Sequence, residues 1–408
     1  MEVLVQKFGG TSVRDRDSRK CAIDHVKQAV KNGYQVVVVV SAIGRFGDPY
    51  ATDTLLSLVN YPETNISNRE VDLLMSCGEI ISSIVFTNEL IEEGIKTAAI
   101  TGPQAGILTT DDFTNARIEK VNTKLINEYF KTYDVIVVAG FQGMDREGNI
   151  TTLGRGGSDT SAVALGAALG AKYVDIFTDV DGIKTADPVI VKNAKTLKVM
   201  TYNEIVHLAY QGSKVIHPRA VEIAMQEKIP IRVRSTYSND EGTLVTSKID
   251  SSIDVKINDR IVTGIAHVSG ITQIKVKATD DPIIVHDRVF QHLAKAGISI
   301  DFFNIFTEGI TFTVPKNKLK QTKKIIRDLN YEVEFVENCA KVSTVGAGIQ
   351  GVPGVASKIV SALAKHKIPI LQSSDSHTTI WVLIKEEDLE VAVNALHDAF
   401  IKHEEKGE

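Results

Sequence analysis

The chain has 408 residues, enough for two or three domains, and its 43% hydrophobic and 24% charged residues are typical of an ordinary soluble protein. Its net charge of −5 argues against nucleic-acid or membrane-surface partners, which select basic surfaces. The three cysteines are scattered and predict neither a disulfide framework nor a zinc site, and because neither a signal peptide nor a membrane span is expected, we predict a cytoplasmic protein.

The first predicted unit is a strand, a helix and a second strand. Hydrophobic runs and a helix-ending glycine give its bounds: strand 3–8 (VLVQKF), helix 15–32 and strand 34–42 (YQVVVVVSA). Ligands of open α/β sheets bind at the carboxyl ends of strands. Lys7, followed by Gly9 and Gly10, therefore lies where a phosphate would bind, although a solvated lysine at a strand end is the more common case.

A polar loop over residues 41–54 follows, and then a helical pattern over residues 70–93. Gly78 inside that helix costs roughly 1 kcal/mol relative to alanine, which indicates close packing or the approach of a ligand. Glu79 beside it is noted because its helix runs near the strand ends. Further strands are predicted at 96–101, 134–141, 173–179 and 229–235. This alternation predicts a mostly parallel sheet with helices on both faces.

Residues 151–161 (TTLGRGGSDTS) form a glycine-rich loop that opens onto an alanine-rich helix over residues 162–171. Unpaired N–H groups at a helix N-terminus bind anions, and Arg155 adds a planar fork suited to a carboxylate or a phosphate. An ordinary turn with a Ser or Asp cap is the competing interpretation.

The C-terminal part contains a repeat. After a polar linker at 238–257, residues 271–304 resemble residues 340–374, and each copy reads strand, loop, helix, strand, followed by another strand and helix. This order predicts two ferredoxin-like modules. The second copy contains GxGxxG at 346–351, a dinucleotide fingerprint, but the first copy lacks it and too little chain follows for a Rossmann domain, so loop geometry is preferred.

The glycine-rich loops, with Lys7, Lys214 and Arg155, suit phosphoryl transfer, which needs mainly positioning and charge neutralisation. The sequence has no P-loop, protein-kinase or nucleophile-elbow motif and no metal-spaced histidines. His217 before Pro218 is interpreted as a cap or packing histidine rather than a catalytic base.

Residues 7–13 (KFGGTSV), the loop 154–159, residues 177–182 (FTDVDG) and the repeats together resemble the aspartate kinases over essentially the whole chain. Residues 47–54 and 370–377 are most similar to the diaminopimelate-sensitive type of spore-forming Gram-positive bacteria. The resemblance implies an α/β amino-acid-kinase fold followed by two ACT domains. The implied bounds are 1–240 for the catalytic domain, 241–260 for a linker, and 261–336 and 337–408 for the ACT domains, with strand exchange between the ACT domains left open.

The resemblance implies transfer of the γ-phosphoryl group of MgATP to the β-carboxylate of L-aspartate. The product is 4-phospho-L-aspartate, the first intermediate towards diaminopimelate, lysine, threonine and methionine, and Mg²⁺ is held mainly by the ATP phosphates, without protein ligands. The implied catalytic residues are Lys7, Arg155 and Asp159. The implied ATP-binding residues are Lys7, Phe8, Gly9, Gly10, Ser41, Thr178, Asp179, Lys184 and Lys214. The implied aspartate-binding residues are Thr52, Glu79, Arg155, Gly156, Gly157 and Ser158.

Feedback inhibition through the ACT domains is also implied, with diaminopimelate expected as the effector and lysine, or lysine with threonine, as the alternatives. Asp281 and Asn304 are the implied effector contacts, and a homodimer or higher oligomer forms through the ACT domains. The second repeat keeps the helix entry 352–355 (VPGV) whereas the first has 280–284 (DDPII), so which repeat binds the effector stays open. Two other functions are weighed: a kinase of another acceptor, such as glutamate, N-acetylglutamate or a nucleoside monophosphate, and a catalytically idle amino-acid sensor.

Overall fold

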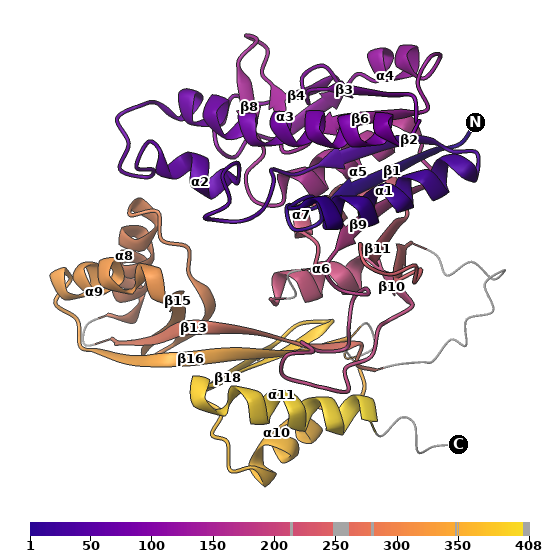
Figure 1. Ribbon diagram of the computed structural model, residues 1–408. Helices are drawn as coiled ribbons and strands as arrows, with labels where there is room; N and C mark the ends of the chain where they lie inside the picture. Colours follow the sequence, from indigo (N-terminus) through magenta and orange to yellow (C-terminus); the bar gives the residue numbers. More distant parts are fainter. Residues whose placement is uncertain (213–214, 248–260, 279–280, 347–348, 350, 403–408) are drawn as a thin grey trace. The chain divides into compact units, whose positions relative to one another are not determined.

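The computed structural model describes residues 1–212, 215–247, 261–278, 281–346, 349 and 351–402. The chain forms two compact units. The first comprises Met1–Lys184, Thr196–Tyr210 and Lys214–Ile257, and the second comprises Thr185–Lys195, Gln211–Ser213 and Asn258–Glu408. Figure 1 shows an α/β arrangement in the first unit and a sheet with helices in the second.

The first unit is built on an eight-stranded sheet in the order β10-β12-β11-β9-β1-β2-β6-β3. Its strands are β1 (Val3–Phe8), β2 (Gln35–Val40), β3 (Thr97–Ile100), β6 (Val135–Ala139), β9 (Tyr173–Thr178), β10 (Val199–Thr201), β11 (Ile231–Ser235) and β12 (Thr243–Thr246). The six strands from β11 to β3 are parallel, and β12 pairs antiparallel with β11. The valine runs are buried because helices cover the sheet, as the alternating pattern predicts.

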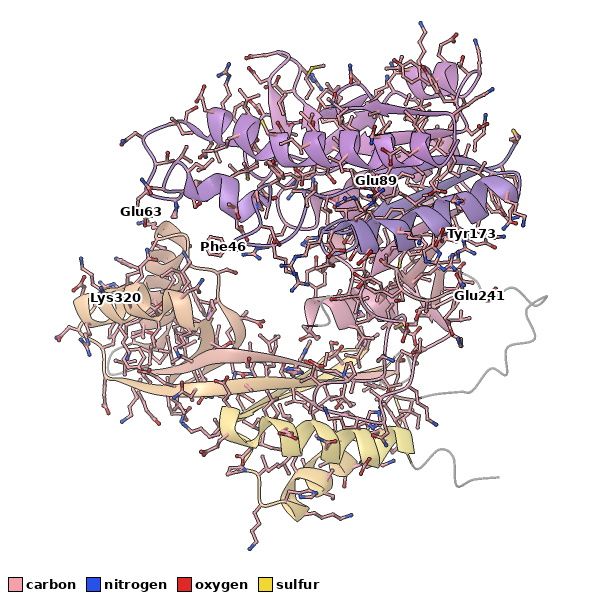
Figure 2. The ribbon with its side chains drawn as sticks, in the orientation of Figure 1. Phe46, Glu63, Glu89, Tyr173, Glu241 and Lys320 are labelled. Carbon is pink, nitrogen blue, oxygen red and sulfur yellow. The ribbon has the colours of Figure 1, made fainter. Side chains whose placement is uncertain are left out.

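Helices cover both faces of this sheet. Their bounds are α1 (Arg16–Lys31), α2 (Thr52–Ser57), α3 (Asn68–Glu92), α4 (Lys124–Tyr129), α5 (Gly157–Leu169), α6 (Tyr202–Tyr210) and α7 (Pro218–Glu227). Helices α1 and α3 share one core with β1, β2 and β6, and Arg19 of α1 donates two hydrogen bonds to Glu89 of α3, which Figure 2 labels. Helix α5 packs against β1, β2 and β9, and its first ten residues are all buried. The predicted fold class is confirmed.

A second sheet of four short strands was not expected from the sequence. It has the order β5-β4-β7-β8, with β4 (Ile107–Thr109), β5 (Ile118–Val121), β7 (Gln142–Met144) and β8 (Ile150–Thr152). Strands of three or four residues carry too little alternation to be recognised. Strand β8 leads directly into the glycine-rich loop that contains Arg155.

Helix α3 is the segment that bears on the expectation that the chain has no membrane span. Among the described residues it is long and apolar enough, by length and composition, to cross a membrane. However, half of its most apolar window is buried inside the unit, with Phe86 and Leu90 in the core beside α1, and its Asp72 and Glu79 are buried as well. This is the pattern of the core helix of a globular unit.

The range 241–260, which the sequence analysis assigns to a linker, contains a strand of the main sheet. Strand β12 hydrogen-bonds to β11 and to β10, so this part of the range belongs to the first unit and is not a linker. Residues 248–260 lie outside the described residues.

The second unit holds a six-stranded antiparallel sheet in the order β14-β15-β13-β16-β18-β17. The first repeat comprises β13 (Gly264–Lys277), α8 (Pro282–Lys295), β14 (Asp301–Phe306), β15 (Gly309–Pro315) and α9 (Leu319–Asp328). The second comprises β16 (Val333–Val345), α10 (Val355–Lys365), β17 (Gln372–Asp375), β18 (Thr379–Lys385) and α11 (Leu389–His397). Both repeats have the predicted β-α-β-β-α order.

The long strands β13 and β16 run through both repeats. Ile265 of β13 lies in the core of the second repeat, whereas Ile274 and Val276 of the same strand lie in the core of the first. A bulge between Val268 and Ile271 separates the two halves of β13. The two repeats therefore share their central strands.

Residues 185–195 belong to the second unit, although the sequence analysis places them in the catalytic domain. Ala186 and Val191 are buried in the core of the second repeat. The hydroxyl of Thr185 lies 2.9 Å from Nε2 of His397, and the N–H of Ile265 donates to the carbonyl of Thr185 over 2.8 Å. This segment follows the 177–184 loop without a break.

Candidate active site

The candidate site lies at the carboxyl ends of central strands of the eight-stranded sheet, which form one edge of it. Strands β9, β1, β2 and β6 are neighbours and run parallel, with Phe8 beside both Val40 and Phe177. The residues that follow these strands therefore meet: Gly9 and Gly10 after β1, Ser41 after β2, Gly140 after β6 and Asp179 after β9. The predicted phosphate loop, which begins at Gly9 and Gly10, and the predicted nucleotide loop, residues 177–184, come together in this way.

An ion pair lies beside the end of β1. Nζ of Lys7 is 2.6 Å from Oδ1 of Asp159, in the first turn of α5, and the side chains of the pair are only 13% and 11% exposed. The other carboxylate oxygen accepts a hydrogen bond of 3.3 Å from the N–H of His217. Asp159 therefore joins β1, α5 and the start of α7.

His217 is a helix cap, as the sequence analysis preferred. It is the N-cap of α7, and its side chain accepts a hydrogen bond from the N–H of Arg219. Burial lowers the pKa of His217, which favours the neutral ring that can accept this bond.

The loop around Arg155 depends on glycines in two left-handed positions. Gly154 has φ = 71° and Gly156 has φ = 66°. A Cβ atom at Gly156 would collide with Cβ and Cγ of His217, so no larger residue fits there without movement. Arg155 between them is exposed, whereas Ser158 beyond them is buried in the first turn of α5. The loop thus presents a guanidinium next to a helix N-terminus, where an anion is favoured.

Glu79 is a buried carboxylate next to this edge. Its Oε1 accepts a hydrogen bond of 3.1 Å from the N–H of Ala42, and its Oε2 has no partner. Burial raises its pKa to about 8. Close packing explains Gly78, because a Cβ atom there would lie 2.8 Å from Cβ of Ala42 and 2.9 Å from the carbonyl oxygen of Tyr50.

The loop after β2 carries a contact that the sequence analysis did not identify. A guanidinium nitrogen of Arg45 lies 3.7 Å from a carboxylate oxygen of Asp179, and both side chains are largely exposed. Phe46 next to it is 73% exposed and is labelled in Figure 2. Thr52 is the first residue of α2 and is half-buried.

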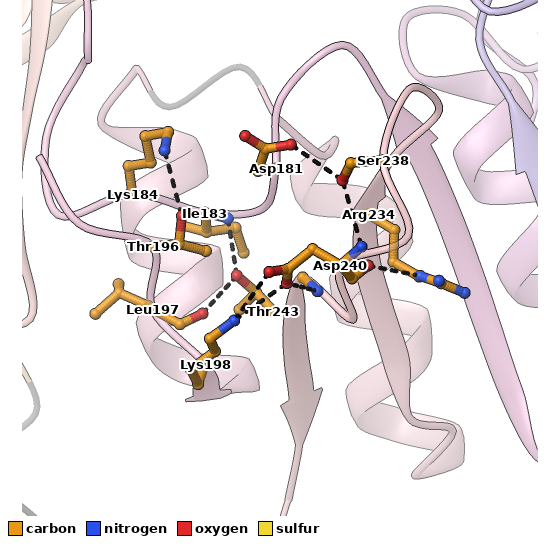
Figure 3. A network of polar contacts seen from close by, with 11 residues as sticks. Asp181, Ile183, Lys184, Thr196, Leu197, Lys198, Arg234, Ser238, Asp240 and Thr243 are labelled. Carbon is orange, nitrogen blue, oxygen red and sulfur yellow. Dashed lines mark hydrogen bonds and ion pairs between the residues drawn. The ribbon is translucent and has the colours of Figure 1, made fainter. Parts of the chain in front are cut away.

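The predicted nucleotide loop is anchored by β12 (Figure 3). Thr243 accepts a hydrogen bond of 2.8 Å from the N–H of Ile183 and donates one of 2.6 Å to the carbonyl of Leu197. The ammonium group of Lys184 donates to Thr196 over 3.2 Å. Thr178 donates to Asp179. Lys214, predicted to reach the phosphates, lies outside the described residues.

The two predicted effector contacts have structural partners. Asp281 is the N-cap of α8 and accepts from the N–H of Ile283 over 3.0 Å. Asn304 on β14 accepts from Gln372 of β17, which joins the first repeat to the second.

Two charged residues that the sequence analysis missed, the buried Asp72 and the half-buried Arg219, hold the backbone that leads to Arg155. Asp72 carried one readable signal, since it lies seven residues, or two helical turns, before Glu79 and so on the same face of α3. Arg219 had no signal beyond its place beside His217.

Comparison with known proteins gives a consistent result. The sequence profile described as the amino acid kinase family matches residues 2–235, and an ACT domain profile matches residues 334–398. Aspartokinase 1 of Bacillus subtilis is 59% identical over 98% of this chain and 99% of its own length. Aspartokinase III of Escherichia coli, solved with aspartate and ADP in its R-state, is 26% identical with a TM-score of 0.78 over 98% of this chain and 99% of its own. The same enzyme with lysine and aspartate in its T-state gives a TM-score of 0.76 at 26% identity, over 98% of this chain and 100% of its own.

Proposed function

We propose, for a chain that belongs to the amino acid kinase family and is an aspartate kinase, that the edge formed by Lys7, Glu79 and Arg155 binds aspartate against the γ-phosphoryl group of ATP. The reaction transfers that group to the β-carboxylate and gives 4-phospho-L-aspartate. The observation that carries the proposed site is the ion pair between Lys7 and Asp159 at the meeting point of the two predicted loops.

The chemistry needs charge neutralisation more than proton transfer. The β-carboxylate of aspartate is ionised at pH 7, so the nucleophile needs no general base. Lys7 neutralises the negative charge on the transferring phosphoryl group, and Asp159 holds its ammonium group in place. The N-terminus of α5 adds a partial positive charge at the same edge.

Aspartate is held by its two other charged groups. Arg155 forms a bidentate pair with the α-carboxylate, beside Ser158 and the backbone of Gly156 and Gly157. Glu79 takes the α-ammonium group, which gives its unpaired Oε2 a partner. Thr52 contacts the substrate from the loop after β2.

The nucleotide binds along the ends of β1, β2 and β9. The residues assigned to it are Phe8, Gly9, Gly10, Ser41, Thr178, Asp179, Lys184 and Lys214. Mg²⁺ is held mainly by the phosphate oxygens of ATP and supplies positive charge there. Among the described residues no group of three or more His, Cys, Asp or Glu side chains could hold a metal ion.

The second unit binds an amino-acid effector and joins two chains. Phe303, Ile305 and Phe306 on the edge strand β14 are each at least half exposed, and an edge strand with exposed apolar side chains favours pairing with a second copy. We assign feedback inhibition to meso-diaminopimelate, with contacts from Asp281 and Asn304, and we place the enzyme in the cytoplasm.

A hydroxylamine trapping assay with MgATP tests the substrate and the effector together, because an acyl phosphate is converted to a coloured hydroxamate. Aspartate should give product, and glutamate and N-acetylglutamate should not. Diaminopimelate, lysine and threonine are then added singly and in pairs, and suppression by lysine alone would replace the assigned effector. Effector binding without hydroxamate from any acceptor would favour the idle-sensor alternative.

A further inference from the structure

The backbone that leads into the Arg155 loop consists of two segments that lie side by side. The N–H of Ala116 donates to the carbonyl of Thr152 over 2.9 Å. Two residues after Thr152, a Cβ atom at Gly154 would lie 2.8 Å from Oδ1 of Asn115, so the segments stay in close contact up to the loop. Arg155 is the next residue, and because its side chain is exposed, its position depends on this backbone.

Asp72 of α3 holds both segments by their donors. Its two carboxylate oxygens each lie 3.0 Å from the N–H of Thr114, and they accept from the N–H and the hydroxyl of Thr152 over 2.8 and 2.7 Å. The residue is fully buried. Burial raises the pKa of Asp72, while these hydrogen bonds favour its charged form.

Arg219 of α7 holds the same two segments by their acceptors. One guanidinium nitrogen donates to the carbonyl of Leu153 over 2.9 Å and another to the carbonyl of Ala116 over 2.8 Å. Its planar fork holds two acceptors in a fixed geometry, whereas a lysine ammonium group is a compact charge on a flexible stem.

Backbone groups, together with the hydroxyl of Thr152 at Asp72, satisfy both charges, and no ion pair of either residue is found in the described part of the chain. A buried charge is costly unless it is hydrogen-bonded. Asp72 accepts hydrogen bonds from the N–H groups of the two segments, and Arg219 donates hydrogen bonds to their carbonyl groups. Together the two side chains fix the segments from both sides. Helix α3, which carries Asp72, also carries Glu79 two turns further on. Helix α7, which carries Arg219, is capped by His217, and the N–H of His217 donates to Asp159.

We propose that Arg219 and Asp72 are positioning residues that hold Arg155 at the distance from Glu79 that aspartate requires. Neither residue touches the substrate. This inference rests on the proposed role of Arg155 in binding the α-carboxylate.

The test compares aspartate with its α-amide, isoasparagine, which keeps the β-carboxylate acceptor but lacks the α-carboxylate. The ratio of kcat/KM for the two substrates measures how well Arg155 is placed. Arg219→Lys, Arg219→Gln and Asp72→Asn should each raise the KM for aspartate about tenfold to a hundredfold, leave the KM for ATP unchanged, and reduce this ratio by a similar factor. Arg232→Lys is the matched control, because Arg232 is also a partly buried arginine that forks onto one partner, Asp175, on another element. The Arg232→Lys substitution should lower thermal stability without changing the ratio of kcat/KM for aspartate and isoasparagine.

Arg155→Lys separates the two claims. If this variant keeps the wild-type ratio, the proposed role of Arg155 is wrong. If it loses the ratio while soluble Arg219 and Asp72 variants keep it, with only their kcat or thermal stability reduced, the positioning inference is overturned. Asp72→Asn preserves side-chain volume and carries the test if the Arg219 variants do not fold.

Discussion

The ammonium group of Lys7, at the end of the first strand, lies 2.6 Å from the carboxylate of Asp159, in the first turn of helix α5. A carboxylate this close neutralises the lysine and fixes its position before any substrate arrives. In the proposed site, the same lysine shares its charge with the phosphates of ATP. The pair is therefore interpreted as a preorganised electrostatic element, and because burying two charges costs hydration, it is weak evidence for a contribution to stability.

Replacing Lys7 by alanine should lower kcat about 100- to 1,000-fold, because a preorganised positive group at a developing negative charge is worth about that much. Effector binding and oligomeric state should not change. Lys172→Ala is the control, since Lys172 pairs with Glu2 at the surface and should not matter. Turnover near the wild-type level in Lys7→Ala would contradict the assigned role.

The KM for aspartate should fall as the pH rises from about 6 towards 8. Burial raises the pKa of Glu79 to about 8 in the free enzyme, so below that pH the residue must release a proton before it can pair with the α-ammonium group. We expect a change of about tenfold per pH unit that levels off above pH 8. Steady-state kinetics across this range, with calorimetry in buffers of different ionisation enthalpy to detect the released proton, would measure it. Glu79→Gln should remove the dependence, and an unchanged slope in that variant would assign the titration elsewhere.

The free energy of unfolding of the free enzyme should decrease over the same pH range in which aspartate binding becomes stronger. The pKa of Glu79 is raised above its ordinary value of 4.5, so the folded state holds a proton that the unfolded state releases. This contribution to the free energy of unfolding is present below pH 4.5 and is lost as the pH rises towards 8. Thermal unfolding without substrate should show a steeper fall over this range for the wild type than for Glu79→Gln, and equal slopes would argue against a protonated Glu79.

Gly156→Ala and Gly170→Ala should differ sharply in their effects on the KM for aspartate and on stability. Both glycines are left-handed, at the N-terminal and C-terminal ends of α5. A Cβ atom added at Gly170 would point into open space, with no neighbouring atom within 4 Å, so its replacement should cost only about 1 kcal/mol of backbone strain. At Gly156 the added carbon collides with His217, which should displace the Arg155 loop and raise the KM for aspartate as well as lower stability. Equal effects of the two substitutions on KM would show that the collision is relieved without moving Arg155.

Phe303→Asp should convert the proposed dimer to a monomer. The side chain is 53% exposed on the edge strand β14, and an aspartate in an apolar interface loses hydration without a partner. Light scattering after gel filtration measures the mass. Val391→Asp on α11, 45% exposed, is the control and should leave the mass unchanged. A dimer that survives Phe303→Asp would place the interface elsewhere.

The parallel core could be predicted because its signals are local. Long valine runs, the helical period of residues 70–93 and glycine at helix ends each act within a few residues. The four-stranded sheet could not be predicted, since strands such as β7 and β8 have three residues each. Strand β12 was hidden in a polar stretch, and its role depends on distant partners such as Ile183.

The site divides in the same way. Lys7, Glu79 and Arg155 could be proposed from the sequence because each lies near glycines in a recognisable motif. The roles of Asp72 and Arg219 could not be predicted, because these residues act mainly on backbone groups that any sequence possesses, and only the fold shows that those groups are adjacent; the spacing of Asp72 from Glu79 indicates a shared helix face and no more. Arg45 was missed because its partner, Asp179, lies across the sheet edge.

Residues 185–195 limit how this chain can be divided. Ala186 and Val191 complete a core whose other members lie after residue 260. A cut in the range 241–260 would therefore yield an N-terminal fragment in which the side chains of Ala186 and Val191 are exposed to solvent. The C-terminal fragment would have two cavities in its core. Neither piece would be a finished module, and swapping regulatory regions between related enzymes would require exchanging this internal segment along with the C-terminal sequence.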